Sequence, residues 1–148
     1  MLDGYFFTNI IFLYIITSES EVIILKLNQD CLRDFLLYCE DNLSYTNEIL
    51  VNSLKLKEYS IEELVYTAQK LNEADFLTIV TKPYFGTAVP SIRVKSITYE
   101  GHKFLDNIRD DSIWKKAKSI LNPIKSMSVE IISETAAKII TQLINQKL

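Results

Sequence analysis

The chain has 148 residues and a formal net charge of −3, and it contains only three glycines and three prolines. This length fits one domain with an appendage. The scarcity of turn-forming residues excludes collagen-like sequence, argues against an all-β sandwich and leaves no glycine-rich phosphate loop. An acidic chain has no general attraction for nucleic acid, so any such contact must come from a local basic patch.

An apolar run from Tyr5 to Ile16 dominates the first 24 residues. The run is shorter than the roughly 20 residues that a membrane-spanning helix needs, so no membrane span is expected. It follows Asp3 rather than basic residues, which argues against a secretory signal. Its β-branched and aromatic residues favour a strand or a hydrophobic arm.

Asn28 is predicted to cap a helix over about Gln29 to Asn42. Cys31 and Cys39 share the apolar face of this helix. At a rise of about 1.5 Å per residue the two cysteines are too far apart for a disulfide, so we expect buried free thiols, which suit a reducing cytoplasm. Residues 45–58 fit either a short helix or a short strand.

Four more helices are predicted from capping residues and from helical spacing of apolar side chains. Ser60 and Glu63 form a capping-box pattern, and Thr98 precedes a helix whose inward face includes Gly101. Asp110 or Asp111 is expected to cap the next helix. The expected helices cover about 61–73, 99–109, 111–121 and 128–146.

A β-hairpin is predicted between the second and third of these five helices. Residues 76–81 and 91–97 have strand composition, and a turn with Pro83 and Gly86 separates them. Alternation on the second strand places Ile92, Val94 and Ser96 on one side.

The predicted fold class is α+β, mainly α. Helix, short element, helix and hairpin follow one another in the order of a winged helix-turn-helix core. We assign this core to residues 25–109, with an N-terminal extension over 1–24 and a two-helix C-terminal extension over 110–148.

Three sequence blocks carry a family resemblance. They are LKLNQDCLRDFLLYCE at 25–40, YSIEELVYT with KL and EADF within 59–76, and ITYEGHKFLDNIRDD with WKK and Lys118 within 97–118. Together they resemble the family catalogued as domain of unknown function 2513, found in Gram-positive bacteria and their phages. The third block is the most specific.

The resemblance implies a small winged-helix protein with a helical tail, and it supplies no activity and no catalytic residues. Family members tend to have glycine where this chain has Asp75, a residue that tolerates a left-handed turn. They usually begin at a methionine where this chain has Leu25. This suggests an upstream mis-start for residues 1–24, as the alternative to a hydrophobic arm.

No motif for catalysis or metal binding is apparent. His102 is the only histidine, and the sequence places no nucleophile elbow, H-E-x-x-H pair or C-x-x-C beside it. One histidine and two cysteines of one helix do not make a zinc site. We therefore expect no enzyme activity, no cofactor and no metal.

The candidate DNA-binding residues lie on the hairpin and on the helix before it. That helix carries Glu62, Glu63 and Glu73, the wrong sign for a phosphate-lined groove, although its amides could read adenine edges. A basic hairpin with aromatic residues fits a minor-groove or single-strand contact, and its alternative is a solvated ribbon. The candidates are Lys82, Tyr84, Arg93, Lys95, Gln69 and Asn72.

A second basic patch surrounds Trp114, with Lys115, Lys116 and Lys118 beside it in sequence. We expect Trp114 to pack under the tail. The lysines offer a phosphate or anionic-lipid contact.

Apolar residues of the last helix follow a short heptad seam. A helix this apolar must bury more than one side, either on its own domain or against a partner. We favour a homodimer over a membrane-surface helix, because the basic face is weak. The seam residues are Val129, Ile132, Ala136, Ile139 and Leu143.

The sequence thus predicts a non-enzymatic, cytoplasmic, phage- or prophage-associated accessory protein that binds DNA through a basic wing. The alternative is a protein-protein interaction module on the same scaffold without DNA binding.

Overall fold

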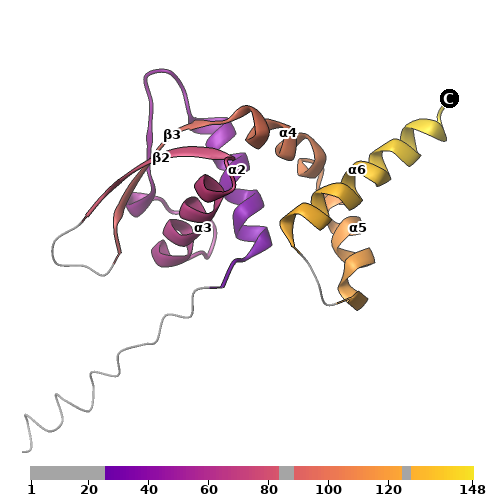
Figure 1. Cartoon of the computed structure of the whole chain (residues 1–148), viewed down its shortest axis with the longest axis horizontal. Coiled ribbons are helices and arrows are strands. Elements are labelled where there is room, and N and C mark those ends of the chain that lie inside the picture. Colours follow the sequence, from indigo (N-terminus) through magenta and orange to yellow (C-terminus); the bar gives the residue numbers. More distant parts are fainter. Residues whose placement is uncertain (1–25, 84–88, 125–127) are drawn as a thin grey trace, which may run out of the picture.

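The computed structural model describes residues 26–83, 89–124 and 128–148. Figure 1 shows a body on one side, in which helices pack beside a sheet, and the C-terminal helices that continue beyond it. The predicted class, α+β and mainly α, is confirmed. The elements are α2 (Gln29–Asn42), β1 (Ile49–Leu50), η1 (Val51–Ser53), α3 (Ile61–Glu73), β2 (Leu77–Lys82), β3 (Ser91–Ile97), α4 (Tyr99–Ile108), α5 (Asp111–Leu121), η2 (Asn122–Ile124) and α6 (Val129–Asn145).

The N-termini of α2 and α3 are tied to each other. The Asn28 carboxamide oxygen accepts from the backbone N–H groups of Asp30 and Cys31, as predicted for a cap. Ser60 caps α3 by accepting from the Glu63 N–H. The Glu63 carboxylate does not return to Ser60 but accepts from the Asn28 side chain at 2.8 Å, which joins the two helix starts.

The three strands form an antiparallel sheet in the order β1-β3-β2. The ambiguous segment 45–58 supplies its edge strand, because Ile49 and Leu50 pair with Val94 and Arg93. Ile92 and Val94 are buried, as predicted. The expected position of Ser96 beside them is wrong, because Thr78 pairs with Ser96 and Ile79 with Val94, and this irregularity breaks the alternation and leaves Ser96 exposed.

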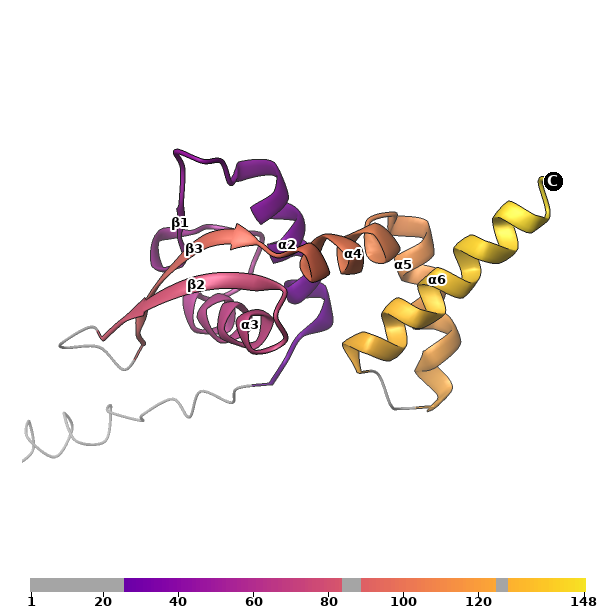
Figure 2. The same cartoon turned by 45° about the horizontal axis from the view of Figure 1, so that its top comes forward.

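The sheet lies against α2 and α3, as Figure 2 shows, and the buried apolar residues of these elements form the core. Asp75 takes the predicted left-handed conformation, with φ of 61°, at the turn from α3 to β2. Gly101 lies in the first turn of α4, where an added Cβ would come within 2.2 Å of the Phe76 carbonyl oxygen. The inward placement of Gly101 is therefore confirmed, and it permits α4 to start against the end of the sheet.

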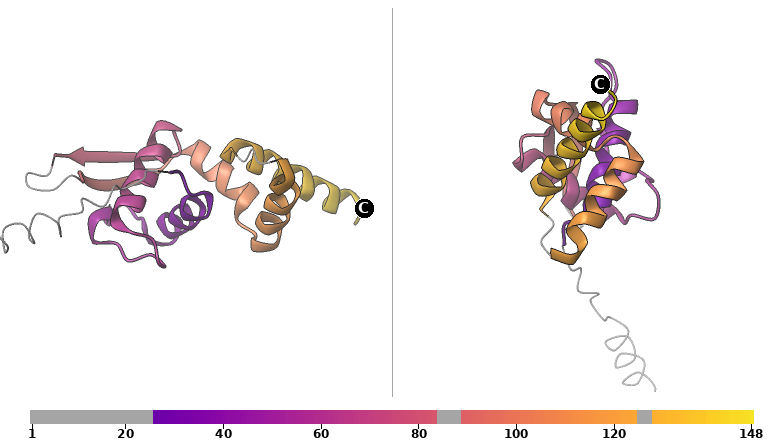
Figure 3. Two further views of the ribbon diagram at one scale, coloured as in Figure 1. Left: turned by 90° about the horizontal axis from the view of Figure 1, so that it is seen from below. Right: turned by 90° about the vertical axis from the view of Figure 1, so that its right-hand side faces the viewer.

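Helices α5 and α6 pack on each other and on α4, and Figure 3 shows them on the side away from the hairpin. Val129, Ile132, Ala136 and Ile139 are buried in this packing. Helices α4 and α5 of the same chain contact α6 on this side, and the use of these residues as a homodimer seam stays a prediction. Of the seam residues only Leu143 stays open, with 41% of its surface exposed.

Two predicted features fall outside the described residues, namely the segment 1–24 and Tyr84 at the hairpin tip. In the part of the chain that the structure covers, no helix is long and apolar enough to cross a membrane.

Candidate functional site

The outer face of the hairpin carries the predicted basic side chains. Arg93 lies on β3 between its cross-strand partners Leu50 and Val80, and all three are exposed. Lys82 follows Val80 by two residues on β2 and so lies on the same face. Lys95 joins them, because it shares a carboxylate partner with Arg93. We call the surface formed by Lys82, Arg93 and Lys95, together with Leu50 and Val80, the wing face.

A single carboxylate is paired with two of the three cations. Glu48 contacts the Lys95 ammonium, and one Glu48 oxygen lies 3.9 Å from the Arg93 guanidinium. The hydrogen bond from Lys95 is the main cause that holds the pKa of Glu48 below its usual range. The Arg93 and Lys95 side chains are still 53% and 41% exposed, so the pairs lie in water and not in the core.

The root of the hairpin is fixed by a side chain that sequence reasoning missed. The Asn52 amide donates to the Pro90 carbonyl and accepts from the Ile92 N–H, both at 2.9 Å. Asn52 belongs to η1, in the segment that the sequence left ambiguous. It holds the start of β3 and thereby orients the wing face.

The surface of helix α3 differs from the wing face, because its one lysine is paired and its predicted base-reading residues are partly engaged within the fold. Its lysine, Lys70, pairs with Glu73 at 2.7 Å and lies over the Tyr66 ring. Asn72, a predicted base-reading residue, accepts from the Ile79 N–H at 3.2 Å and so holds β2 against α3. Gln69 is half-buried. The structure therefore does not combine α3 and the hairpin into one basic surface.

A groove of about 520 Å³ lies between the end of α2, β3 and the start of α4. Glu40 accepts two hydrogen bonds from Arg109, which lower its pKa, and its carboxylate lies 3.6 Å from His102. The Cys39 thiol lines the groove, and burial raises its pKa to about 12. A thiol with this pKa stays protonated at neutral pH and is a poor nucleophile.

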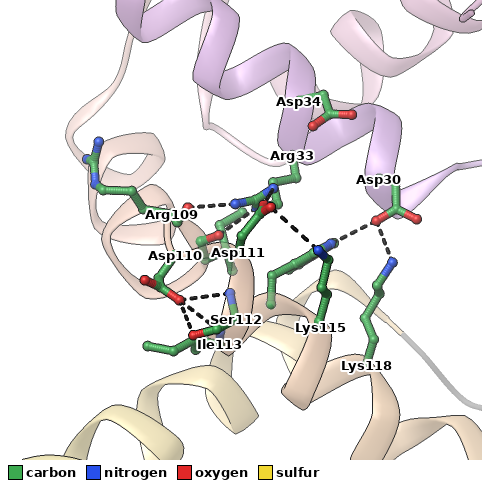
Figure 4. Close-up of polar contacts among 12 residues, drawn as sticks. Asp30, Arg33, Asp34, Arg109, Asp110, Asp111, Ser112, Ile113, Lys115 and Lys118 are labelled. Atoms are coloured by element: carbon green, nitrogen blue, oxygen red, sulfur yellow. Dashed lines mark hydrogen bonds and ion pairs between the residues drawn. The ribbon is translucent and has the colours of Figure 1, made fainter. Parts of the chain in front are cut away.

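The junction between the body and the C-terminal helices contains the most buried charged group among the described residues. Arg33 on α2 is 6% exposed and donates to the carbonyls of Ile108 and Arg109 at 2.7 and 2.6 Å. Its third nitrogen lies 2.8 Å from Asp111. One guanidinium thus donates to two backbone carbonyls at the end of α4 and pairs with a carboxylate at the start of α5, as Figure 4 shows.

The neighbouring residues complete this junction. Trp114 is 3% exposed, lies 5.7 Å from the Arg33 guanidinium and donates from its ring nitrogen to Asp30 at 2.7 Å. Lys118 also contacts Asp30, at 2.5 Å. Trp114 therefore packs against α2 as well as within the extension. The positive charge of the expected second basic patch is partly offset, since Lys118 is paired with Asp30 and Lys115 lies 3.7 Å from Asp111.

Comparisons with known proteins place the chain in a family. The profile of the family described as "Hypothetical protein (DUF2513)" matches residues 26–128, which run from Lys26, shortly before α2, to Ser128, the N-cap of α6. An uncharacterized protein of Haemophilus influenzae is 26% identical over 121 residues, which cover 81% of this chain and 99% of that protein. No solved structure matches. The match over most of the chain, from α2 through α5, shows that the protein is a member of the DUF2513 family.

Proposed function

We propose that this protein is a non-enzymatic DNA-binding protein that contacts the duplex through its wing face. The order α2, β1, η1, α3, β2 and β3 supports the proposal, because it matches the order of a winged helix, in which the hairpin would be the wing. The association with phages or prophages, implied by the family resemblance, belongs to the same proposal.

One observation supports the proposal most directly. Lys82, Arg93 and Lys95 are exposed on one face of the hairpin formed by β2 and β3, and β1, β2 and β3 contain no acidic residue. With Glu48 included, the wing face carries a net charge of about +2. Neutralisation of phosphates by lysine and arginine supplies most of the affinity of non-specific DNA binding.

The wing face is a better candidate than α3 because of its charge. Lys70 is already paired with Glu73, and Glu62 precedes it on the same helix. A helix with this balance would bring carboxylates toward phosphates at a cost in binding free energy. We therefore assign the contact to the hairpin in the manner of a wing that binds the minor groove.

The test replaces Lys82, Arg93 and Lys95 together with alanine and measures binding of a fluorescein-labelled duplex by anisotropy at several salt concentrations. We expect weaker binding and a log-log salt slope that is shallower by up to about three. The matched control replaces three exposed lysines of the C-terminal extension, Lys116, Lys138 and Lys147. Circular dichroism checks that both variants are folded.

Two results would contradict the proposal. One is the absence of salt-sensitive binding by the unaltered protein, and the other is an equal loss in the control variant. The first result would favour a protein partner for the same face, on which Leu50 and Val80 are exposed beside the cations. The second would place the DNA contact outside the wing face.

A further inference from the structure

We propose that Glu48 is a built-in competitor for phosphate on the wing face, an inference that rests on the proposed DNA-binding function. Its carboxylate occupies the space between Lys95 and Arg93, where a phosphate of the duplex would bind. A duplex therefore has to displace the carboxylate from these cations before the full charge of the wing face becomes available.

The backbone on both sides of Glu48 is fixed, which distinguishes this contact from an incidental surface pair. On one side Ser44 and Asn47 exchange two backbone hydrogen bonds at 3.2 Å, and Asn47 also donates to the Asn42 carbonyl. On the other side Ile49 is buried and pairs with Val94. Glu48 is thus held above β3 by a closed turn and by an edge strand.

The effect on DNA binding follows from charge. Removal of the one carboxylate leaves both cations without their shared partner and raises the net charge of the wing face by one. Each additional neutralised phosphate steepens the log-log salt slope by about 0.9. Exposed charges are screened beyond roughly 10 Å at moderate salt, so the effect is confined to this face and weakens as salt is added.

The experiment uses the full chain with Glu48→Gln, and Glu58→Gln as the control for the same charge change. Glu58 is exposed in the loop before α3. We expect Glu48→Gln to bind a short duplex about three- to tenfold more tightly at low salt, with a slope steeper by about one. The control is expected to change the affinity less than twofold. Equal affinities for the two variants, with binding by the unaltered protein, would overturn the inference and leave the proposed function standing.

A second readout does not need DNA. Limited acetylation of the lysines, quantified by mass spectrometry, compares Lys95 with the exposed Lys55. We expect Glu48→Gln to raise the modification of Lys95 relative to Lys55 severalfold, because the ammonium loses its partner. Unchanged modification would overturn the contact itself. Raised modification together with no salt-sensitive binding in any variant would show that the contact exists and that the proposed function is wrong.

Discussion

The body and the junction of this protein are held together in different ways. From α2 to β3 the buried side chains are almost all apolar, and many neighbours share the contribution of each one. At the junction, Arg33 is buried and contacts four groups on α4 and α5, namely two carbonyls, a carboxylate and an indole ring. Apolar burial tolerates small changes, whereas a polar junction depends on the particular side chains that make it.

The largest loss of stability is expected for Arg33→Ala, which tests this difference. The variant leaves the carbonyls of Ile108 and Arg109 without their donor and removes the cover of Trp114. We expect a loss of about 3 kcal/mol in the free energy of unfolding. Urea denaturation measures it, followed by far-UV circular dichroism and by the fluorescence of Trp114, the only tryptophan in the chain.

The control for Arg33→Ala is Arg109→Ala. Arg109 is also an arginine near the end of α4, but its pairs with Glu40 and Asp106 are exposed. Such surface pairs contribute about 0 to 1 kcal/mol. Similar losses in the two variants would mean that the junction is no more demanding than the surface.

A smaller loss is expected when the contact between α4 and the body is overpacked at Gly101. An added methyl group would meet the Phe76 carbonyl oxygen at 2.2 Å and the Ile97 side chain at 2.7 Å. Gly101→Ala should therefore destabilise the protein by about 1 to 3 kcal/mol, although alanine favours an exposed helix interior by about 1 kcal/mol. Thermal denaturation measures the effect, and a higher melting temperature would refute the close approach of α4 to the sheet.

The smallest expected effect is the pH dependence of the junction. Partial burial raises the pKa of Asp30, but hydrogen bonds from Lys118 and Trp114 outweigh this and hold the pKa below its usual range. The stability that Asp30 contributes is present above its unfolded-state pKa of about 3.9, and it is lost as pH falls through the lower folded-state pKa.

The contribution of Asp30 is expected to be at most about 1 kcal/mol, because its side chain is 50% exposed. Acid titrations followed by Trp114 fluorescence should show a transition at higher pH in Asp30→Asn than in the unaltered protein. Asp41→Asn, at an exposed carboxylate near the other end of α2, is the control. Identical titrations for all three proteins would remove Asp30 from the account of acid stability.

Local features of the fold were predictable from the sequence because the interacting groups are neighbours in the chain. The cap residues Asn28, Ser60, Thr98, Asp110 and Ser128 each accept from a backbone N–H within three residues. The apolar spacing that defines the buried helix faces has the same short range. The fold class and the hairpin follow from such patterns.

The features that the sequence did not resolve depend on residues far apart in the chain. Glu48 and Lys95 are separated by 47 positions, and Asp30 and Trp114 by 84. Periodicity identified an apolar seam on α6, but it could not distinguish cover by α4 and α5 from cover by a second copy. The hairpin cations Lys82, Arg93 and Lys95 are exposed, and their role in DNA binding stays a prediction. The carboxylate of Glu48, which pairs with two of them, came from a segment with no clear pattern.

Because Cys31 and Cys39 are buried, the reactivity of their thiols reports how often the body unfolds. Burial raises the pKa of the Cys31 thiol to about 11 and that of the Cys39 thiol to about 12. Reagents that modify thiolates therefore react slowly with the folded protein and rapidly when local unfolding exposes the two cysteines of α2. The rate of alkylation then measures how often the body unfolds under native conditions.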